Sequence, residues 1–413
     1  MVTRKTHVKA TDLRGAARLA TDATQGLADL VEAMHERIGR LPGLPPGAAP
    51  GRTRGITGLV YRSVRGVTRL VGGSVDGMLA LLEPMLGPTL AAPGATTSPE
   101  REALLSALNG VLGDRLATNA NPLATTMGFY RGQQALITTA PLGVDLVPAN
   151  GPLLLQIHGL CMNHLQWQHN GHDHGQALAR DAGYTTLGLR YNSGLHIAAN
   201  GLALAQQLER LLGQRKEALG RVLLLCHSMG GLVARSALAQ GQALGQRWPG
   251  MVDDLVFLGT PHQGAPLERV GQWLHLLLGA TPYAAPIGQL AGLRSAGITD
   301  LRHGAVLPSE EATDAAAASD RFARSNTLPR HLPLPQQPRC YAVAGQLGEP
   351  HQALKNQLLG DGLVPLASAL GQHDDPARCL HFEPGRTWVG HGLGHMALLA
   401  DARVYAQLRA WLG

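Results

Sequence analysis

The sequence predicts an α/β fold in which a mostly parallel sheet is covered by helices and preceded by a helical extension. From about residue 121 onward, short apolar runs alternate with stretches of helical periodicity, which is typical of a parallel sheet. Before that point, apolar residues recur at three- and four-residue steps, the period of one helix face. The composition agrees, since 413 residues that are 45% apolar and 15% charged supply a packed core and exclude a chain that is disordered throughout.

Residues 1–120 are expected to form the helical extension. Three helices are expected in it, over residues 13–38, 56–82 and about 99–116. The segment LPGLPPGAAPG at 41–51 separates the first two, because proline removes backbone donors and restricts the residue before it. Ser98 is placed to cap the third helix.

Residues 121–413 are expected to form the α/β domain. Its expected strands are Leu153–Ile157, Tyr184–Tyr191, Val222–Cys226, Leu255–Leu258, Tyr341–Ala344 and Cys379–Phe382. Helices are expected over 174–182, 199–217, 229–241 and 397–412. The segment 264–338 interrupts this alternation and is too long for a structureless loop in a compact domain, so we expect an inserted helical cap over a site.

The formal net charge of +6 comes entirely from the N-terminal part of the chain. Residues 1–80 hold 12 Lys and Arg against six Asp and Glu, and the two kinds balance over residues 81–413. A nucleic-acid enzyme is expected to interleave basic and aromatic residues, but Tyr61 is the one aromatic residue in the basic stretch. The sequence therefore predicts no nucleic-acid partner.

The four cysteines are scattered, at Cys161, Cys226, Cys340 and Cys379, and none has the CxxC spacing of a zinc site. Cys226 and Cys340 fall inside apolar runs, so we expect buried free thiols and a reducing compartment. The N-terminus lacks the apolar stretch of a signal peptide, and no run of about 18 apolar residues occurs. A cytoplasmic protein without a spanning helix is expected.

The strongest local signal for chemistry is LLLCHSMGG at 223–231. An apolar strand runs directly into Ser228, and a helical pattern follows two glycines later. A nucleophile elbow needs this arrangement, a sharp strand-to-helix turn that exposes a serine hydroxyl beside small neighbours. The pattern G-x-S-x-G is incomplete because Cys226 replaces the first glycine, and an ordinary serine at a helix start is the alternative interpretation.

A nucleophilic serine needs a base, and the base needs an orienting acid. GHGLGHMALLAD at 390–401 places His391 and His395 just before the last amphipathic helix. GDGLVP at 360–365 places Asp361 in a turn after an expected strand. Both segments leave the carboxyl ends of strands, the edge at which open α/β sheets place their sites.

Five motifs occur in order along the chain: HGL (158–160), HSMGG (227–231), LGTPHQG (258–264), DGLVP (361–365) and GHMALL (394–399). Together they resemble the lipase and esterase branch of the α/β-hydrolase superfamily, including its bacterial triacylglycerol-lipase-like and GPI-inositol-deacylase-like members. The resemblance covers about residues 121–413 and implies Ser228 as nucleophile, Asp361 as acid and His395 as base. His391 is the alternative base, and Asp253 and Asp254 are the alternative acids.

The resemblance also implies an oxyanion hole. The expected strand 153–157 ends in His158-Gly159, like the loop that carries half of a lipase oxyanion hole. The backbone N–H groups of Leu160 and Met229 would then bind the oxyanion. His158 itself is expected to form structural hydrogen bonds rather than to catalyse.

Two weaker features leave alternatives open. HNGHDHG at 169–175 clusters His169, His172 and His174, which suggests either a polar loop or a metal site. The expected helix 56–82 has an apolar stripe and a basic face that holds Arg62, Arg65 and Arg69, so it either packs against the α/β domain or another subunit or lies on an anionic membrane.

The sequence as a whole predicts a serine hydrolase that cleaves an ester, through an acyl-enzyme and without metal or organic cofactor. An expected cap favours an apolar acyl chain. Two other functions remain open at this stage, an acyltransferase with the same triad and a binding protein that has lost the activity.

Overall fold

The computed structural model describes residues 10–39, 58–73, 76, 98–136, 151–213, 220–265, 295–308, 331–348 and 360–413. The chain divides into two compact units: Met1–Arg101 with Leu116–Ala124, and Glu102–Arg115 with Thr125–Gly413. Most of the segment 264–338, the expected cap, lies outside the described residues, as do the linker 41–51 and the end of the expected helix 56–82.

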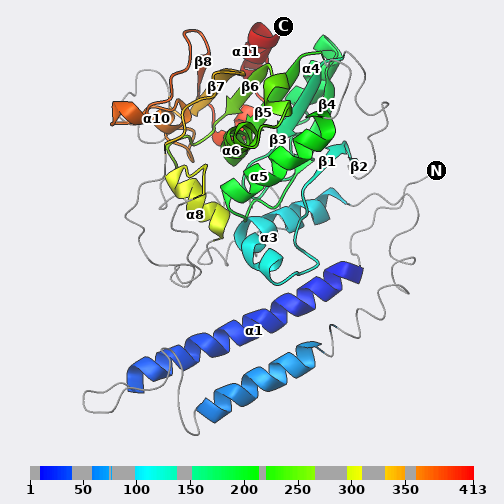
Figure 1. Ribbon diagram of the computed structural model, residues 1–413, viewed down its shortest axis with the longest axis vertical. Coiled ribbons are helices and arrows are strands. Elements are labelled where there is room, and N and C mark those ends of the chain that lie inside the picture. Colours follow the sequence, from blue (N-terminus) through cyan, green and yellow to red (C-terminus); the bar gives the residue numbers. More distant parts are fainter. Residues whose placement is uncertain are drawn as a thin grey trace, which may run out of the picture. The chain divides into compact units, whose positions relative to one another are not determined.

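An eight-stranded sheet forms the centre of the second unit (Figure 1). Its order is β2-β1-β4-β3-β5-β6-β7-β8. The strands are β1 (Gly128–Arg131), β2 (Gln134–Leu136), β3 (Leu153–Ile157), β4 (Thr185–Arg190), β5 (Val222–His227), β6 (Asp254–Leu258), β7 (Arg339–Gln346) and β8 (Thr387–His391). All pairs from β4 to β8 are parallel, and the two antiparallel pairs lie at the β1–β2 edge. The predicted mostly parallel sheet is therefore confirmed.

The predicted strands are confirmed with one exception. All side chains of β3, β5 and β6 are buried, which is why these strands read as continuous apolar runs in the sequence. The prediction of a strand at Cys379–Phe382 was wrong. The chain there leaves the 3₁₀ turn Pro376–Arg378, and Leu380 N donates to Gly371 O in a loop rather than in the sheet.

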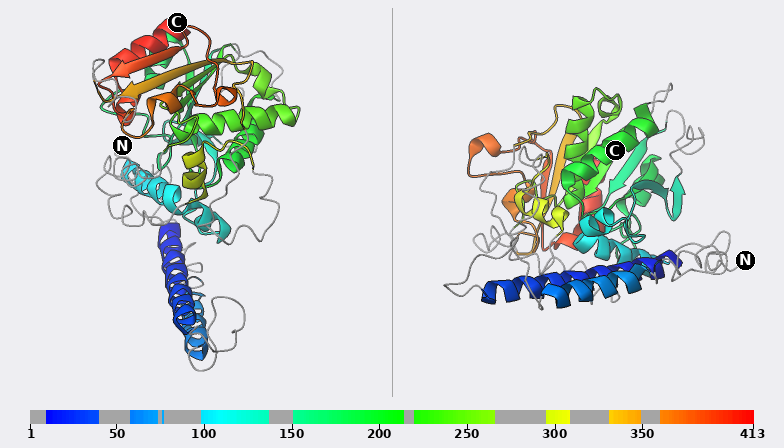
Figure 2. Two further views of the ribbon diagram at one scale, coloured as in Figure 1. Left: turned by 90° about the vertical axis from the view of Figure 1, so that its left-hand side faces the viewer. Right: turned by 60° about the horizontal axis from the view of Figure 1, so that its bottom comes forward.

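Helices cover both faces of the sheet, as the left view of Figure 2 shows. They include α4 (His174–Ala182), α5 (Ile197–Leu208), α6 (Met229–Ala243) and α11 (Ala402–Leu412). Gln156 of β3 donates to Asp173 at the start of α4, and Tyr341 of β7 contacts Trp411 of α11 on the same face. Phe257 faces the opposite side, where Gly231 of α6 approaches its ring. Sheet alternation thus assigns α4 and α11 to one face and α6, packed with α5, to the other.

Side-chain caps set where two of these helices begin. Asp173 accepts from Gly175 N and Gln176 N at the start of α4, and Asp401 accepts from Arg403 N at the start of α11. The last helix was predicted to begin at 397, but residues His395–Leu399 form a 3₁₀ turn and α11 begins only after Asp401.

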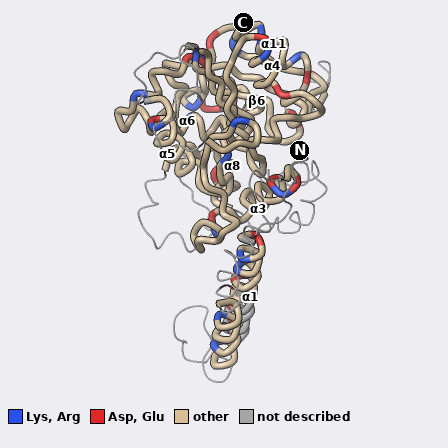
Figure 3. The backbone as a smooth tube through the Cα atoms, turned by 90° about the vertical axis from the view of Figure 1, so that its right-hand side faces the viewer, with Lys and Arg blue, Asp and Glu red and all other residues tan. Residues whose placement is uncertain are grey.

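The first unit contains two antiparallel helices, α1 (Ala10–Gly39) and residues 58–73. Ion pairs join their facing sides, since Arg65 contacts Glu32 at 2.6 Å and Arg18 contacts Asp76 at 2.5 Å. The hydrogen bond from Arg18 holds the pKa of Asp76 well below its usual range. Basic and acidic positions both occur along α1 (Figure 3).

The helix α3 (Pro99–Thr118) begins as the sequence predicts, with Ser98 Oγ accepting from Arg101 N at 3.2 Å. In the part of the chain that the structure describes, all four cysteines are free thiols, and Cys226 and Cys340 are buried as expected. No helix among the described residues is long and apolar enough to span a membrane.

Candidate active site

Ser228 lies in a sharp turn between β5 and α6. Its backbone has φ 54° and ψ −127°, a left-handed conformation that few non-glycine residues adopt and that costs about 1–3 kcal/mol. The turn is held because Ser228 N donates to Leu258 O at 2.9 Å, on the neighbouring strand. The Ser228 side chain is buried, and its Oγ makes no hydrogen bond with any described residue. This strained strand-to-helix turn is the geometry of a nucleophile elbow.

Glycines allow the elbow to approach its neighbours. An added Cβ at Gly230 would lie 2.2 Å from Ile157 O, and one at Gly231 would lie 2.2 Å from Thr260 Oγ1. An added Cβ at Gly159 would lie 3.0 Å from Ser228 Cβ. These contacts explain why the motif HSMGG needs both glycines, and they place the loop after β3 directly against Ser228.

Asp361 and His395 form a buried pair on the loops after β7 and β8. His395 Nδ1 donates to Asp361 Oδ2 at 2.6 Å, and His395 N donates to Asp361 O at 3.0 Å. The other carboxylate oxygen, Oδ1, accepts from the backbone N–H groups of Leu363 and Val364 at 3.0 and 2.8 Å. Main-chain donors therefore hold Asp361 in place through Oδ1, while Oδ2 orients the imidazole of His395.

Two contacts connect this pair with the elbow. Gly259 follows Leu258, the residue that accepts from Ser228 N, and an added Cβ at Gly259 would lie 3.1 Å from both Asp361 Oδ2 and His395 Cε1. His227, the residue before Ser228, has its ring centroid 4.7 Å from that of His395. The structure thus gathers Ser228, Asp361 and His395 at the carboxyl edge of the sheet.

The loop that carries Leu160 is anchored by its neighbours rather than by secondary structure. Cys161 N donates to Ser193 Oγ at 3.0 Å, and Tyr191 OH donates to His158 O at 2.7 Å. Leu160 follows Gly159, the residue that approaches Ser228. Met229 is the first residue of α6, where N–H groups have no acceptor within the helix. Both predicted oxyanion donors therefore belong to segments that touch the elbow.

The buried His158 has structural contacts. Its ring stacks on Tyr191 with centroids 4.2 Å apart, and its Nδ1 lies 2.8 Å from Gly159 O. Burial lowers the pKa of His158 to about 3, so the ring is neutral at physiological pH.

The alternative acids and base lie in other surroundings. Asp253 and Asp254 stand at the start of β6, the opposite end of the sheet from Ser228, where Asp254 pairs with Arg221 and Arg339 and Asp253 accepts from Val222 N. His391 is the last residue of β8, in register with Gln346, and does not belong to the loop that carries His395. The acid that contacts a histidine here is Asp361, and the histidine is His395.

The side chains of the HNGHDHG segment, residues 169–175, form a helix cap and local contacts. Asp173 caps α4, His172 Nε2 and His174 Nδ1 lie 2.9 Å apart, and His174 Nε2 lies 2.9 Å from Leu398 O. Among the residues that the structure describes, no group of three or more His, Cys, Asp or Glu side chains could hold a metal ion. The contact with Leu398 joins this segment to the turn that begins with His395.

Sequence reasoning missed His227 as a supporting residue. Its Nε2 lies 3.3 Å from His395 O, and its ring meets Trp167 edge-on with centroids 6.4 Å apart. Burial, with the nearby His395, lowers the pKa of His227 well below its usual value. A histidine directly before the serine was the visible signal, but its packing against His395 depends on a contact 168 residues away in the chain.

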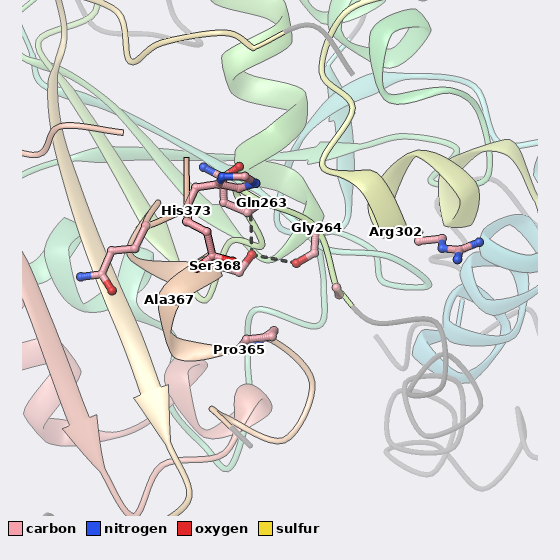
Figure 4. A pocket seen from close by; sticks show the side chains of 10 residues that line it. Gln263, Gly264, Arg302, Pro365, Ala367, Ser368 and His373 are labelled. Carbon is pink, nitrogen blue, oxygen red and sulfur yellow. Dashed lines mark hydrogen bonds between the residues drawn. The ribbon is translucent and has the colours of Figure 1, made fainter. Parts of the chain in front are cut away.

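A pocket of about 640 Å³ lies beside residues 365–368, which follow Asp361 in the chain (Figure 4). Pro365, Ala367 and Ser368 line it, a few residues after Asp361, together with Gln263 and Arg302. Ser368 Oγ donates to Gly264 O at 2.7 Å and fixes one wall. Ser228, Asp361 and His395 are not among its lining residues, so this pocket is separate from the three residues.

Residues 149–323 match a family described as the PGAP1-like alpha/beta domain. This match covers β3, β4, β5 and β6 and the elbow. No curated protein matches the chain.

Several solved structures are similar to the chain at low identity. A Bacillus licheniformis lipase, BlEst2 in its mature form, is 18% identical over 69% of this chain and 97% of its own, with a TM-score of 0.40. A lipase-esterase related protein from Clostridium acetobutylicum is 11% identical over 70% and 100%, with a TM-score of 0.36. The metagenomic carboxyl esterase MGS0156 is 16% identical over 80% and 97%, with a TM-score of 0.35.

Proposed function

We propose that the chain is an α/β-hydrolase of the lipase and esterase type, and that it cleaves carboxylic esters with Ser228 as nucleophile. The observation that carries the proposal is the 2.6 Å contact between His395 Nδ1 and Asp361 Oδ2, beside a serine held at a positive φ. A nucleophile, a base and an orienting acid are the three parts that acyl transfer from an ester needs.

In the first half of the reaction, His395 Nε2 takes the proton of Ser228 as Oγ attacks the carbonyl carbon. Asp361 accepts a hydrogen bond from Nδ1–H, which fixes the tautomer whose Nε2 is basic and stabilises the imidazolium that forms. The backbone N–H groups of Leu160 and Met229 receive the negative charge on the former carbonyl oxygen. The tetrahedral intermediate then collapses as the bond between the acyl carbon and the alcohol oxygen breaks, and His395 gives its proton to the leaving alcohol.

In the second half, water replaces the alcohol. His395 takes a proton from water, whose oxygen attacks the acyl carbon bound to Ser228. The intermediate releases the carboxylic acid as the proton returns to Ser228 Oγ. We propose an apolar acyl chain as substrate, because a cap over 264–338, as the sequence predicts, would cover an apolar cleft that favours such chains.

The experiment that tests this proposal is labelling with a fluorophosphonate probe, which forms a bond with an activated serine. The wild-type protein is expected to react, and Ser228→Ala is expected to lose both the label and hydrolysis of p-nitrophenyl esters. Full hydrolysis by Ser228→Ala would overturn the mechanism. Hydrolysis that is outcompeted by transfer to an added alcohol would reassign the protein as an acyltransferase.

We also propose that the helix 58–73 contacts an anionic membrane surface. Six aliphatic side chains on it are 43% or more exposed: Leu59, Val60, Val64, Val67, Leu70 and Val71. The side that faces α1 carries small and polar residues instead, among them the buried Arg65. An outward apolar stripe on a helix that has Arg62 and Arg69 but no acidic residue complements anionic lipid. A reducing compartment such as the cytoplasm is supported by the free thiols of Cys226 and Cys340.

A further inference from the structure

The turn that carries His395 receives a hydrogen bond from a distant histidine. His174, the first residue of α4, is fully buried, and its Nε2 lies 2.9 Å from Leu398 O. Leu398 belongs to the 3₁₀ turn His395–Leu399. Because a carbonyl oxygen can only accept, His174 carries a proton on Nε2 and donates a hydrogen bond to this turn.

The carbonyl of Leu398 has no other donor among the residues that the structure describes. The backbone N–H groups of Ala400 and Asp401 both donate to Ala397 O instead. Leu398 is itself fully buried, so loss of the bond from His174 would leave a buried acceptor without a partner. The histidine therefore fixes a part of the turn that the backbone leaves unsatisfied.

The side chain of the same leucine reaches the pair of Asp361 and His395. An added Cβ at Gly259 would lie 2.8 Å from Leu398 Cδ1 and 3.1 Å from both Asp361 Oδ2 and His395 Cε1. The three side chains therefore surround one point beside the 2.6 Å bond between Asp361 and His395. A displacement of Leu398 would change the packing of this pair.

Neighbouring side chains fix the tautomer and the plane of the His174 ring. Because Nε2 carries the proton, Nδ1 of the neutral ring is an acceptor, and His172 Nε2 donates to it at 2.9 Å. Backbone hydrogen bonds in both directions between His169 and His172 hold this donor in place. Tyr405 of α11 lies nearly parallel to the His174 ring, with centroids 5.9 Å apart. Burial lowers the pKa of His174 to about 4, so the ring is neutral at physiological pH.

We propose that His174 is a positioning residue, which holds the turn of the base His395 through its hydrogen bond to Leu398 O. This inference rests on the proposed role of His395 as base. It gives the HNGHDHG segment a function, since His172 sets the tautomer of His174 and His174 holds the turn. His174 acts on the base through Leu398 rather than on the substrate.

The first experiment compares two amides at position 174 by hydrolysis of a soluble p-nitrophenyl ester. In His174→Gln the amide nitrogen can occupy the place of Nε2 and donate to Leu398 O, whereas the shorter side chain of His174→Asn ends near the place of Nδ1. His174→Asn is expected to lower kcat about 10- to 100-fold with little change in KM, because a displacement of about 1 Å at a reacting group has an effect of this size. His174→Gln is expected to restore most of kcat.

The second experiment observes the base without substrate. The proton between His395 Nδ1 and Asp361 Oδ2 lies in a short bond to a carboxylate and is expected to give a far-downfield proton NMR signal, which Asp361→Asn assigns by removing it. His174→Asn is expected to shift or lose this signal, and His174→Gln to keep it. Trp411→Phe is the matched control, since Trp411 Nε1 also donates to a backbone carbonyl at 2.9 Å, that of Gly385 before β8. It is expected to keep both the signal and kcat.

The outcomes separate this inference from the ester hydrolysis on which it rests. A wild-type protein that neither reacts with the fluorophosphonate probe nor hydrolyses the ester would overturn the proposed function, while the NMR signal would still report the position of the imidazole. Equal signals in His174→Asn and His174→Gln would overturn the role of His174. A lower kcat of His174→Asn with an unchanged signal, or a change confined to KM, would overturn it as well.

Two further measurements keep the test valid if His174→Asn does not fold. His174→Phe then takes its place, because it keeps a ring beside Tyr405 but has no donor for Leu398 O. In the wild type, nitrogen NMR shifts of His174 are expected to show a protonated Nε2 and an unprotonated Nδ1. The opposite tautomer would overturn the proposal without any variant.

Discussion

Replacing Asp361 by Asn tests the acid at a single atom, because the structure dictates how the new amide must sit. Oδ1 accepts from the N–H groups of Leu363 and Val364, so the amide oxygen of Asn must occupy that place to avoid two unpaired donors. The NH₂ group then faces His395 Nδ1, where Oδ2 stood at 2.6 Å. A donor in that place makes Nδ1 an acceptor and moves the ring proton to Nε2.

With its proton on Nε2, the imidazole has no lone pair left for the Ser228 hydroxyl. The same inversion of tautomer in a serine protease triad lowers kcat about 10⁴-fold, and we expect a loss of similar size here. A factor of 10⁴ corresponds to about 5.4 kcal/mol in the activation free energy. Folding should change little, since Asn keeps the acceptor for both backbone donors.

The assay is hydrolysis of a soluble p-nitrophenyl ester, with the unfolding midpoint measured on the same preparations. Asp401→Asn is the matched control, since Asp401 also accepts from a backbone N–H group but lies at the cap of α11. It is expected to keep wild-type kcat. If Asp361→Asn stays within about tenfold of wild type, Asp361 does not orient the base and the reasoning fails.

Three further changes follow from other parts of the structure. Gly230→Ala is expected to destabilise the fold by about 3 kcal/mol in urea unfolding, because the new Cβ would lie 2.2 Å from a carbonyl of β3, whereas Gly250→Ala, with nothing within 4 Å, should cost far less. The hydrogen bond that His196 donates to Asp300 raises the pKa of His196, so the pair stabilises the fold below the ordinary pKa of about 6.5 and loses this contribution as pH rises through the raised value. An NMR titration should show that Asp300→Asn returns this pKa toward 6.5, and an unchanged pKa would exclude the carboxylate as the cause. Val67→Glu is expected to weaken co-sedimentation with phosphatidylglycerol vesicles at least about tenfold without changing hydrolysis of a soluble ester. If the variant binds the vesicles as well as the wild type does, the apolar stripe of helix 58–73 does not contact the membrane.

The parts of the fold that the sequence predicts well are those whose burial leaves a local pattern. The central strands β3 and β5 are apolar at nearly every position because both of their faces are covered. The edge strands β1, β2 and β8 were not predicted, since each has exposed or half-exposed positions and little apolar periodicity. Short edge strands depend on pairing with a neighbour, which no local window contains.

The candidate site divides in a similar way. Ser228 was predicted because the parts of its turn are adjacent in the sequence: an apolar strand, two glycines and the start of a helix. The contact of Asp361 with His395 spans 34 residues, and position along the chain alone left His391 open as the base.

Asp361 and His395 are tied twice, once through their side chains and once through His395 N and Asp361 O. An insertion that shifts either loop by one residue would therefore break a structural bond and a functional one together. The two loops must therefore keep their lengths together. Transfer of His395 into another α/β scaffold requires the turn that carries Asp361 to be moved with it, whereas the elbow, which is joined to the neighbouring strand by its own bond to Leu258, can be exchanged separately.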